Sequence, residues 1–322
     1  MSRLPELPLL RLMLTFEAEE RIVDLPPFRG AFWRGLFGRA LKQLARADTP
    51  IEAVWPEEIA TIGFGRYRRD SLYEMLFAPG EEALNIPAFR QPPPPFVVDM
   101  PGGLEVLRAG ATELVGLTLI GDAAAEALPA VLAAFALAAR DGLGGNRGRA
   151  RLADAAVCWR EPGGHIPVLS NQGYVTLVPA DVPPVPPCPA EIEVLLATPL
   201  RLQAGRGVLG PETLHAADLL EALVRRTSLL QRAYGAEPLT TDFGALFALA
   251  RASRMFDVDL EFAAQHRWSG HQRQEIDMGG VVGSFRLALG GIEPLWPYLF
   301  LGQWLHVGKG TAMGMGSIRL RD

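Results

Sequence analysis

The stretch HVGKGTAMGMGSIRL, residues 306–320, places four glycines within nine positions and Lys309 between the first two of them. Glycine at this density indicates a backbone that approaches another group closely, because glycine lacks a Cβ and tolerates positive φ. Successive backbone N–H groups in such a loop can form an anion-binding nest, to which the lysine would add a positive charge. We therefore predict a phosphate-binding loop made of Gly308, Lys309, Gly310, Thr311, Gly314 and Gly316.

The loop matches neither of two familiar nucleotide-binding motifs. A Walker loop needs G-x-x-x-x-G-K-[ST] between a strand and a helix, but Gly302 lies one residue too far from the Gly-Lys pair, and Gly310 replaces the hydroxyl residue. The dinucleotide fingerprint also fails, because this loop leaves a predicted helix and enters a strand. The only cysteines, Cys158 and Cys188, cannot form a four-cysteine zinc site. We expect neither a cofactor nor a metal.

Hydrophobic patterning outward from the loop predicts the same order of elements twice. The first round comprises a strand at 7–16, a helix at 31–47, strand-like residues at 104–122, an apolar helix at 123–139 and a glycine-rich loop entering a strand at 141–157. The second comprises a strand at 191–203, a helix at 215–235, strands at 257–268 and 281–290, a helix at 294–308 and a strand at 317–322. Both rounds follow a βαββαβ order.

Residue identities support an internal duplication. Aligning Pro129 with Pro297 also aligns Gly142 with Gly310, Gly148 with Gly316, Arg151 with Arg319 and Leu152 with Leu320. Between the two rounds, residues 179–190 (PADVPPVPPCPA) have the composition of a semi-rigid linker. We therefore predict an α+β fold of two tandem ferredoxin-like domains, at 1–180 and 191–322, with a proline-rich linker at 181–190 and a C-terminal glycine-rich loop.

The charge is patched, although the net charge of −5 argues by itself against a nucleic-acid partner. Residues 25–47 carry five basic side chains and no acid, and residues 140–151 carry four arginines against Asp141. No signal-peptide pattern or membrane-spanning apolar stretch is present, since Glu126 and Pro129 interrupt the longest apolar run. We expect a cytoplasmic protein with no membrane partner.

Three segments resemble the CRISPR repeat-processing endoribonucleases, a family of the RAMP superfamily of RNA-binding proteins. They are WSGHQRQEIDMGGVVGSF at 268–285, LWPYLFLGQWLHVGKGTAMGMGSIRL at 295–320 and LPPFRGAFWRGLFGRALKQL at 25–44. The resemblance implies two tandem ferredoxin-like domains and metal-independent cleavage of precursor CRISPR RNA within each repeat. It further implies 2′-OH attack that leaves a 2′,3′-cyclic phosphate, and retention of the mature guide RNA. Other CRISPR-associated effector subunits are further candidate partners.

Such cleavage needs a base, an acid and cationic groups for the phosphate. The family often carries a catalytic histidine in or near its first helix, whereas this sequence has none before His165. The catalytic candidates are therefore His266 and His271 in the family-like segment, and Arg29, Arg34 and Tyr67 in and after the opening helix. Cations near His271 would keep its pKa low enough for a neutral base. A purely structural role is the alternative for each candidate.

Further RNA-binding candidates are basic residues on presumed outer faces. Beside the glycine loop they are Arg39, Lys42, Arg46, Arg147, Arg149, Arg151, Arg267 and Arg273. Arginines 147, 149 and 151 alternate as in a strand, so their side chains would share one face, although a solvated charged edge is an equal explanation. Two other functions stay open: a non-cleaving RNA-binding RAMP subunit of an effector complex, and an unrelated nucleotide-using enzyme.

Overall fold

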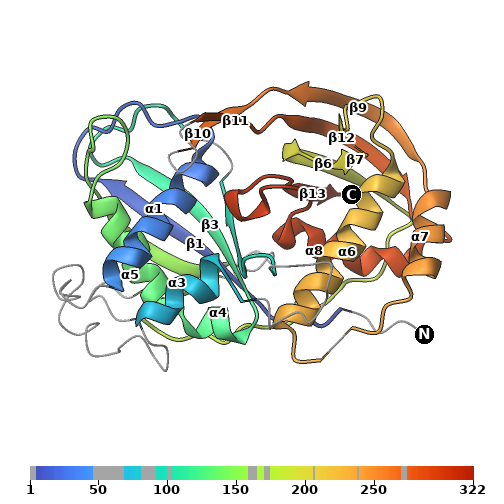
Figure 1. Ribbon diagram of the computed structural model, residues 1–322, viewed down its shortest axis with the longest axis horizontal. Coiled ribbons are helices and arrows are strands. Elements are labelled where there is room, and N and C mark those ends of the chain that lie inside the picture. The colour runs from blue at the N-terminus through green and yellow to red at the C-terminus, as the bar shows by residue number, and fades with distance from the viewer. Residues whose placement is uncertain are drawn as a thin grey trace. The chain divides into compact units, whose positions relative to one another are not determined.

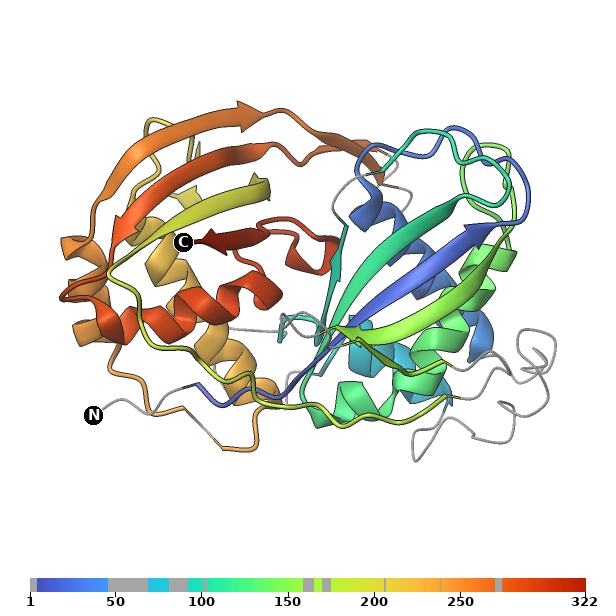
Figure 2. The same cartoon turned by 180° about the vertical axis from the view of Figure 1, so that it is seen from behind.

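The computed structural model describes residues 5–45, 69–80, 92–100, 103–158, 165–169, 175–205, 207–237, 239–269 and 274–322. The chain divides into two compact units, shown in Figures 1 and 2. The N-terminal unit comprises Leu7–Val182, and the C-terminal unit comprises Pro183–Asp322 together with the residues before Leu7.

The N-terminal unit is a sheet with helices on one face. Its elements are β1 (Leu9–Ala18), α1 (Arg29–Leu44), α3 (Arg69–Phe77), β2 (Phe96–Asp99), β3 (Thr112–Ile120), α4 (Asp122–Glu126), α5 (Leu128–Arg140), β4 (Ala150–Cys158) and β5 (His165–Pro167). The strands pair antiparallel in the order β2-β3-β1-β4-β5. Helices α1 and α5 lie behind the sheet in Figure 2. Both helices on one face of a sheet in this order make a ferredoxin-like unit.

The core of this unit follows from a period-two pattern in β1. Leu12, Leu14 and Phe16 are buried, whereas the residues between them are partly exposed, because successive side chains of a strand point to opposite faces. The ring of Phe16 stacks on Trp33 of α1 with 4.4 Å between centroids, and Trp33 is fully buried. Aromatic packing therefore fixes α1 on the sheet.

The C-terminal unit repeats this arrangement. Its main elements are β6 (Glu191–Leu200), β7 (Gln203–Ala204), β8 (Gly207–Val208), α6 (Ala216–Tyr234), α7 (Phe243–Ala252), β9 (Met255–Ala263), β10 (His266–Ser269), β11 (Gln274–Asp277), β12 (Gly280–Ala288), η3 (Glu293–Leu295), α8 (Trp296–Leu305), η4 (Thr311–Met313) and β13 (Ile318–Arg321). The main sheet has the order β13-β6-β12-β9, again antiparallel. The order matches that of β4, β1, β3 and β2 in the first unit, so the predicted fold class is confirmed.

The repeated sequence features occupy equivalent places in the two units. Pro129 and Pro297 both lie in the first turn of the helix that precedes a glycine-rich loop. A backbone hydrogen bond closes each loop. The N–H of Leu143 donates to the Gly148 carbonyl at 2.8 Å, and the N–H of Val307 donates to the Gly316 carbonyl at 3.0 Å. Proline suits the first helical turn because the N–H it lacks would have no helical acceptor there. The residues that align between the two halves of the sequence therefore occupy equivalent positions in the two units.

The structure departs from the predicted elements in one place that matters for the site. The single strand expected at 257–268 is two strands, β9 and β10, and β10 forms a hairpin with β11. Residues 264 and 265 separate the two strands. Among the described helices, none is long and apolar enough to cross a membrane.

Candidate nucleic-acid interface

The glycine-rich loop leaves α8 at His306 and returns to the sheet at β13. His306 has φ +55°, which is uncommon for a residue with a Cβ. Gly308, Gly310, Gly314 and Gly316 have φ between +63° and +85°, the left-handed region that glycine occupies without steric cost. The density of glycine is therefore explained by four left-handed positions around the short η4 turn.

The end of β6 holds the loop in place. Thr198 accepts a hydrogen bond from the backbone N–H of Ser317 at 2.9 Å, and its hydroxyl donates to the carbonyl of Gly314 at 2.7 Å. The N–H of Gly316 donates to the Pro199 carbonyl at 3.1 Å, and the N–H of Lys309 to the Arg201 carbonyl at 3.0 Å. The loop is thus an ordered extension of the sheet.

These contacts correct part of the predicted phosphate nest. A Cβ on Gly316 would lie 1.8 Å from the Val307 carbonyl oxygen, and a Cβ on Gly308 would lie 2.7 Å from the Arg201 carbonyl oxygen. The close approach that these glycines permit is therefore to the protein's own backbone. Thr311 and Gly314 are buried, so the predicted contact through the Thr311 side chain has no support from its position.

A smaller set of donors is still available for an anion. Within the described chain, the N–H groups of Gly308, Gly310, Thr311 and Ala312 have no hydrogen-bond acceptor. Gly310 is partly exposed, and Lys309 is exposed. The free N–H groups on partly exposed residues are those of Gly308 and Gly310, on either side of the exposed Lys309, which is the composition of a small anion site.

Arg201 connects this loop with the β10–β11 hairpin. Its carbonyl accepts from Lys309, as above, while its guanidinium donates to the carbonyl of Gly279 at 2.7 Å and to the Asp277 carboxylate at 3.0 Å. The side chain of Arg201 is only 17% exposed, so these bonds are partly shielded from water. A hydrogen bond from the Gly279 N–H, followed by Arg201, holds the pKa of Asp277 below its ordinary value.

His266 is the histidine among the catalytic candidates that the structure describes. It is exposed and lies opposite Asp277 in the β10–β11 pairing. The pairing places an imidazole and a carboxylate next to each other across the hairpin. His271 and Arg273 lie between the two strands in the sequence and fall outside the described residues, as does the side chain of Arg267.

Arg29, a catalytic candidate at the start of α1, does not face the solvent. Its side chain is fully buried, with its Nε 2.7 Å from an Oε atom of Glu113, itself 5% exposed. The guanidinium also donates to the carbonyls of Pro26 and Leu104. Burial raises the pKa of Glu113, and Arg29 partly offsets this shift. Arg29 therefore holds the start of α1 to β3 and the 103–107 segment, and this position argues against contact with RNA.

The other basic residues of α1 lie nearer the surface. Arg34 lies over the ring of Phe77 with 5.0 Å to its centroid, and Lys42 lies 4.2 Å from the centroid of Tyr73, so both interact with α3. Arg39 and Lys42 are exposed, as the helical period predicts. The remaining candidates from this region, Arg46 and Tyr67, are outside the part of the chain that the structure describes.

The three arginines near β4 do not form one strand face. Only Arg151 lies in β4, whereas Arg147 is in the preceding turn with φ +53° and donates to the Asp141 carbonyl at 3.1 Å. Arg149 pairs with Glu20 at 3.0 Å, and Arg151 pairs with Glu17. Acids on and after β1 therefore neutralise two of these arginines, which favours the structural explanation for them.

The sequence contained little sign of Arg201 and Asp277. Arg201 stands in no recognised motif, and Asp277 lies in the family-like segment 268–285 but was not singled out there. The bond between them joins the end of one strand to the end of another. The available signal was the position of Asp277 immediately before Met278-Gly279-Gly280. A carboxylate before glycines commonly accepts a local backbone N–H, and Asp277 accepts that of Gly279 at 2.8 Å.

Comparison with protein families accounts for nearly the whole chain. A model named AF_1859_N, an N-terminal domain, matches residues 7–179, and the model described as CRISPR-associated endoribonuclease Cas6 matches residues 194–318. The C-terminal part of the chain therefore belongs to the Cas6 family. Members of this family are endoribonucleases, and the resemblance seen in residues 268–285 and 295–320 falls in the Cas6 match. No curated protein matches the sequence.

Solved Cas6 structures share the fold at low sequence identity. A product complex of Cas6 (TTHB231) has a TM-score of 0.56 and 18% identity, and the match covers 98% of this chain and 99% of that one. Thermus thermophilus Cas6 (TTHB231) gives 0.53 and 16% over 98% and 99%. A partial Cas6-RT-Cas1–Cas2 complex gives 0.58 and 14% over 99% of this chain and 47% of that one. At such identities the likeness establishes the tandem ferredoxin-like fold of this chain and nothing further.

Proposed function

We propose that this Cas6 protein binds precursor CRISPR RNA and cuts it within each repeat without a metal ion. The single observation that carries the proposal is the position of Arg201. Its carbonyl holds the Lys309 N–H of the glycine loop, and its guanidinium holds Asp277 of the histidine-bearing hairpin. A phosphate-binding element and a candidate base are thereby fixed to one residue of the same unit.

The proposed reaction is an internal phosphoryl transfer. The ribose 2′-oxygen attacks the adjacent phosphorus and loses its proton to a base, and the bond from phosphorus to the 5′-oxygen breaks as that oxygen gains a proton. The products are a 2′,3′-cyclic phosphate and a 5′-OH. His266 and His271 are the candidate bases, and His266 lies across the hairpin from Asp277. Lys309 and the free N–H group of Gly310 stabilise the charge on phosphate.

The proposed partners are the repeat RNA, the mature guide RNA that stays bound after cleavage, and further CRISPR-associated subunits. The product complex of a Cas6 with this fold and the Cas6-RT-Cas1–Cas2 assembly support these partners. Arg39, Lys42 and Lys309 are the exposed cations proposed to contact RNA phosphates.

A specific observation favours a second function, that of a non-cleaving RNA-binding subunit. No histidine precedes His165 in the sequence, and the buried Arg29 is engaged with Glu113, so the opening helix offers neither of these groups for catalysis. Such a protein would share the fold and the RNA, and would differ only in the absence of cleavage.

Incubation of the purified protein with its own repeat RNA in EDTA separates the two functions. The proposed enzyme leaves a 2′,3′-cyclic phosphate end, and a substrate with a 2′-deoxy nucleotide at the cut site stays intact. Tight RNA binding without any cut product would assign the second function. Absence of binding to the repeat at low salt would refute both.

Among the histidine candidates, the alanine variant of the true base should slow single-turnover cleavage by roughly 10²-fold or more with RNA affinity nearly unchanged. His266→Ala and His271→Ala form a matched pair, since only one of them is expected to show this effect. Wild-type rates in both variants would exclude histidine as the base.

A further inference from the structure

A cavity in the C-terminal unit is separate from the glycine loop and the hairpin. Its volume is about 460 Å³, and three segments line it: the start of α6, the end of α7 with the residues after it, and the beginning of β9. The lining residues are Leu214, His215, Ala216, Ala217, Arg251, Ser253, Arg254, Met255 and Val258. The volume is within the usual range for small-molecule sites, which begins at roughly 300 Å³.

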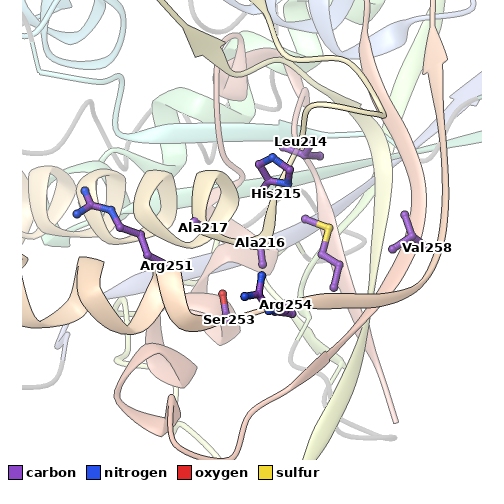
Figure 3. A pocket seen from close by; sticks show the side chains of 9 residues that line it. Leu214, His215, Ala216, Ala217, Arg251, Ser253, Arg254 and Val258 are labelled. Atoms are coloured by element: carbon purple, nitrogen blue, oxygen red, sulfur yellow. The ribbon is translucent and has the colours of Figure 1, made fainter.

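The lining is cationic. It contains two arginines and a histidine, and none of the lining residues is acidic. Figure 3 shows His215 and Arg254 on either side of Ala216, whereas Arg251 points away from them. Arg254 is exposed, and within the described chain it makes no ion pair or hydrogen bond with a side chain. One arginine is thus available to an external anion.

Two carboxylates of α6 near the cavity are already engaged. Asp218 turns back to accept the backbone N–H of His215 at 2.9 Å, and Glu221 holds Arg251 at 3.0 Å and Arg225 at 2.6 Å. The Asp218 cap also occupies the start of α6, so the helix end itself is not what makes the site. The candidate site is defined by the cavity itself, whose wall includes Arg254 and His215.

The rest of the wall is apolar and uncovered. Val258 is 53% exposed, Met255 is partly exposed, and Leu214 is buried beneath them. A flexible thioether and an exposed valine suit the flat face of a ring. A ligand that fits both the cationic and the apolar part of the cavity wall has an anionic group and a planar apolar group close to each other.

We propose that this cavity binds a nucleotide, with its phosphate on Arg254 and His215 and its base against Met255 and Val258. The nucleotide is supplied either by the RNA chain that the protein binds or by the free nucleotide pool. The inference does not depend on cleavage, because the contacts that carry it lie in the cavity alone.

The test follows the methyl resonance of Met255 by NMR, assigned with Met255→Leu. Adenosine 5′-monophosphate should shift this resonance, and adenosine should do so much less, because the phosphate provides the charge-assisted contact. Arg254→Glu should weaken binding of the nucleotide by at least about tenfold. Arg108→Glu is the matched control, since Arg108 is exposed, lies in the other unit and changes the net charge equally.

Repeat RNA distinguishes the two sources. If Arg254→Glu lowers repeat-RNA affinity more than Arg108→Glu does, the nucleotide belongs to the bound RNA. If the two variants bind RNA equally, the site takes a free nucleotide. A Met255 resonance that neither the monophosphate nor the RNA shifts would overturn the inference, as would equal shifts by monophosphate and adenosine. A wild-type protein that binds the monophosphate but not the repeat would refute the proposed function and leave this inference standing.

Discussion

Two substitutions in the glycine loop separate its role in the fold from its role in binding. Gly316→Ala should destabilise the C-terminal unit strongly, whereas Gly310→Ala should destabilise it mildly and weaken RNA binding. Both residues have positive φ, +63° at Gly316 and +79° at Gly310, so each alanine incurs a backbone cost of roughly 1–2 kcal/mol. The two sites differ in what a Cβ would meet.

At Gly316 the new Cβ would lie 1.8 Å from the Val307 carbonyl oxygen, so the backbone must move. That movement would disturb the hydrogen bonds from Val307 to Gly316 and from Gly316 to Pro199. With about 1 kcal/mol for each bond, the expected total loss is on the order of 3–4 kcal/mol. At Gly310 the Cβ would lie 2.7 Å from the sulfur of Met315, a flexible side chain that can shift, so the loss stays near the backbone cost.

The assay is urea unfolding followed by circular dichroism, together with repeat-RNA affinity measured where both variants are folded. Gly310→Ala should bind RNA several-fold more weakly, because the added Cβ strains the positive φ of Gly310 and displaces its N–H from the proposed phosphate site. Equal stability of the two variants would refute the steric reasoning. Wild-type RNA affinity in a folded Gly310→Ala protein would mean that the loop only closes the fold.

Three further predictions concern charge. Arg29→Met should destabilise the protein by roughly 3–5 kcal/mol in urea unfolding, because it leaves the buried Glu113 without a counter-charge, and an unchanged midpoint would contradict that role. Burial raises the pKa of Glu113 above its ordinary 4.5, so the folded protein binds this proton more tightly than the unfolded chain does. As the pH rises above about 4.5, the free energy of unfolding of the wild-type protein should therefore fall relative to that of Glu113→Gln. A difference between the two proteins that does not change with pH would contradict the raised pKa. The logarithm of the association constant for repeat RNA should fall linearly with the logarithm of the salt concentration, and Arg39→Ala and Lys309→Ala should each reduce the steepness of this slope by about 1. A flat salt response would contradict the RNA proposal.

The proline-rich segment shows what can and cannot be predicted from composition. Residues 183–190 belong to the C-terminal unit, where the Trp296 indole N–H donates to the carbonyl of Pro186 at 2.8 Å and the Leu289 N–H donates to the carbonyl of Ala190 at 2.8 Å. Proline content indicates a stiff backbone. Composition contains no information on whether a stiff segment is free or is packed against a neighbouring element.

The sequence by itself predicted the repeated βαββαβ pattern and the duplicated ferredoxin-like fold, whereas helix α7 and the β10–β11 hairpin were not predicted. Strand and helix periods state which face of each element is apolar, and the repeated prolines and glycines mark the same turns in both halves. Only the tertiary structure decided what stands opposite each charged or glycine residue. Arg29 was a catalytic candidate in the sequence, but in the fold it is buried against Glu113, and Gly316 and Gly308 of the loop approach the backbone of Val307 and Arg201. Periodicity is a local property of the chain, whereas a partner is set by contacts between residues far apart in sequence.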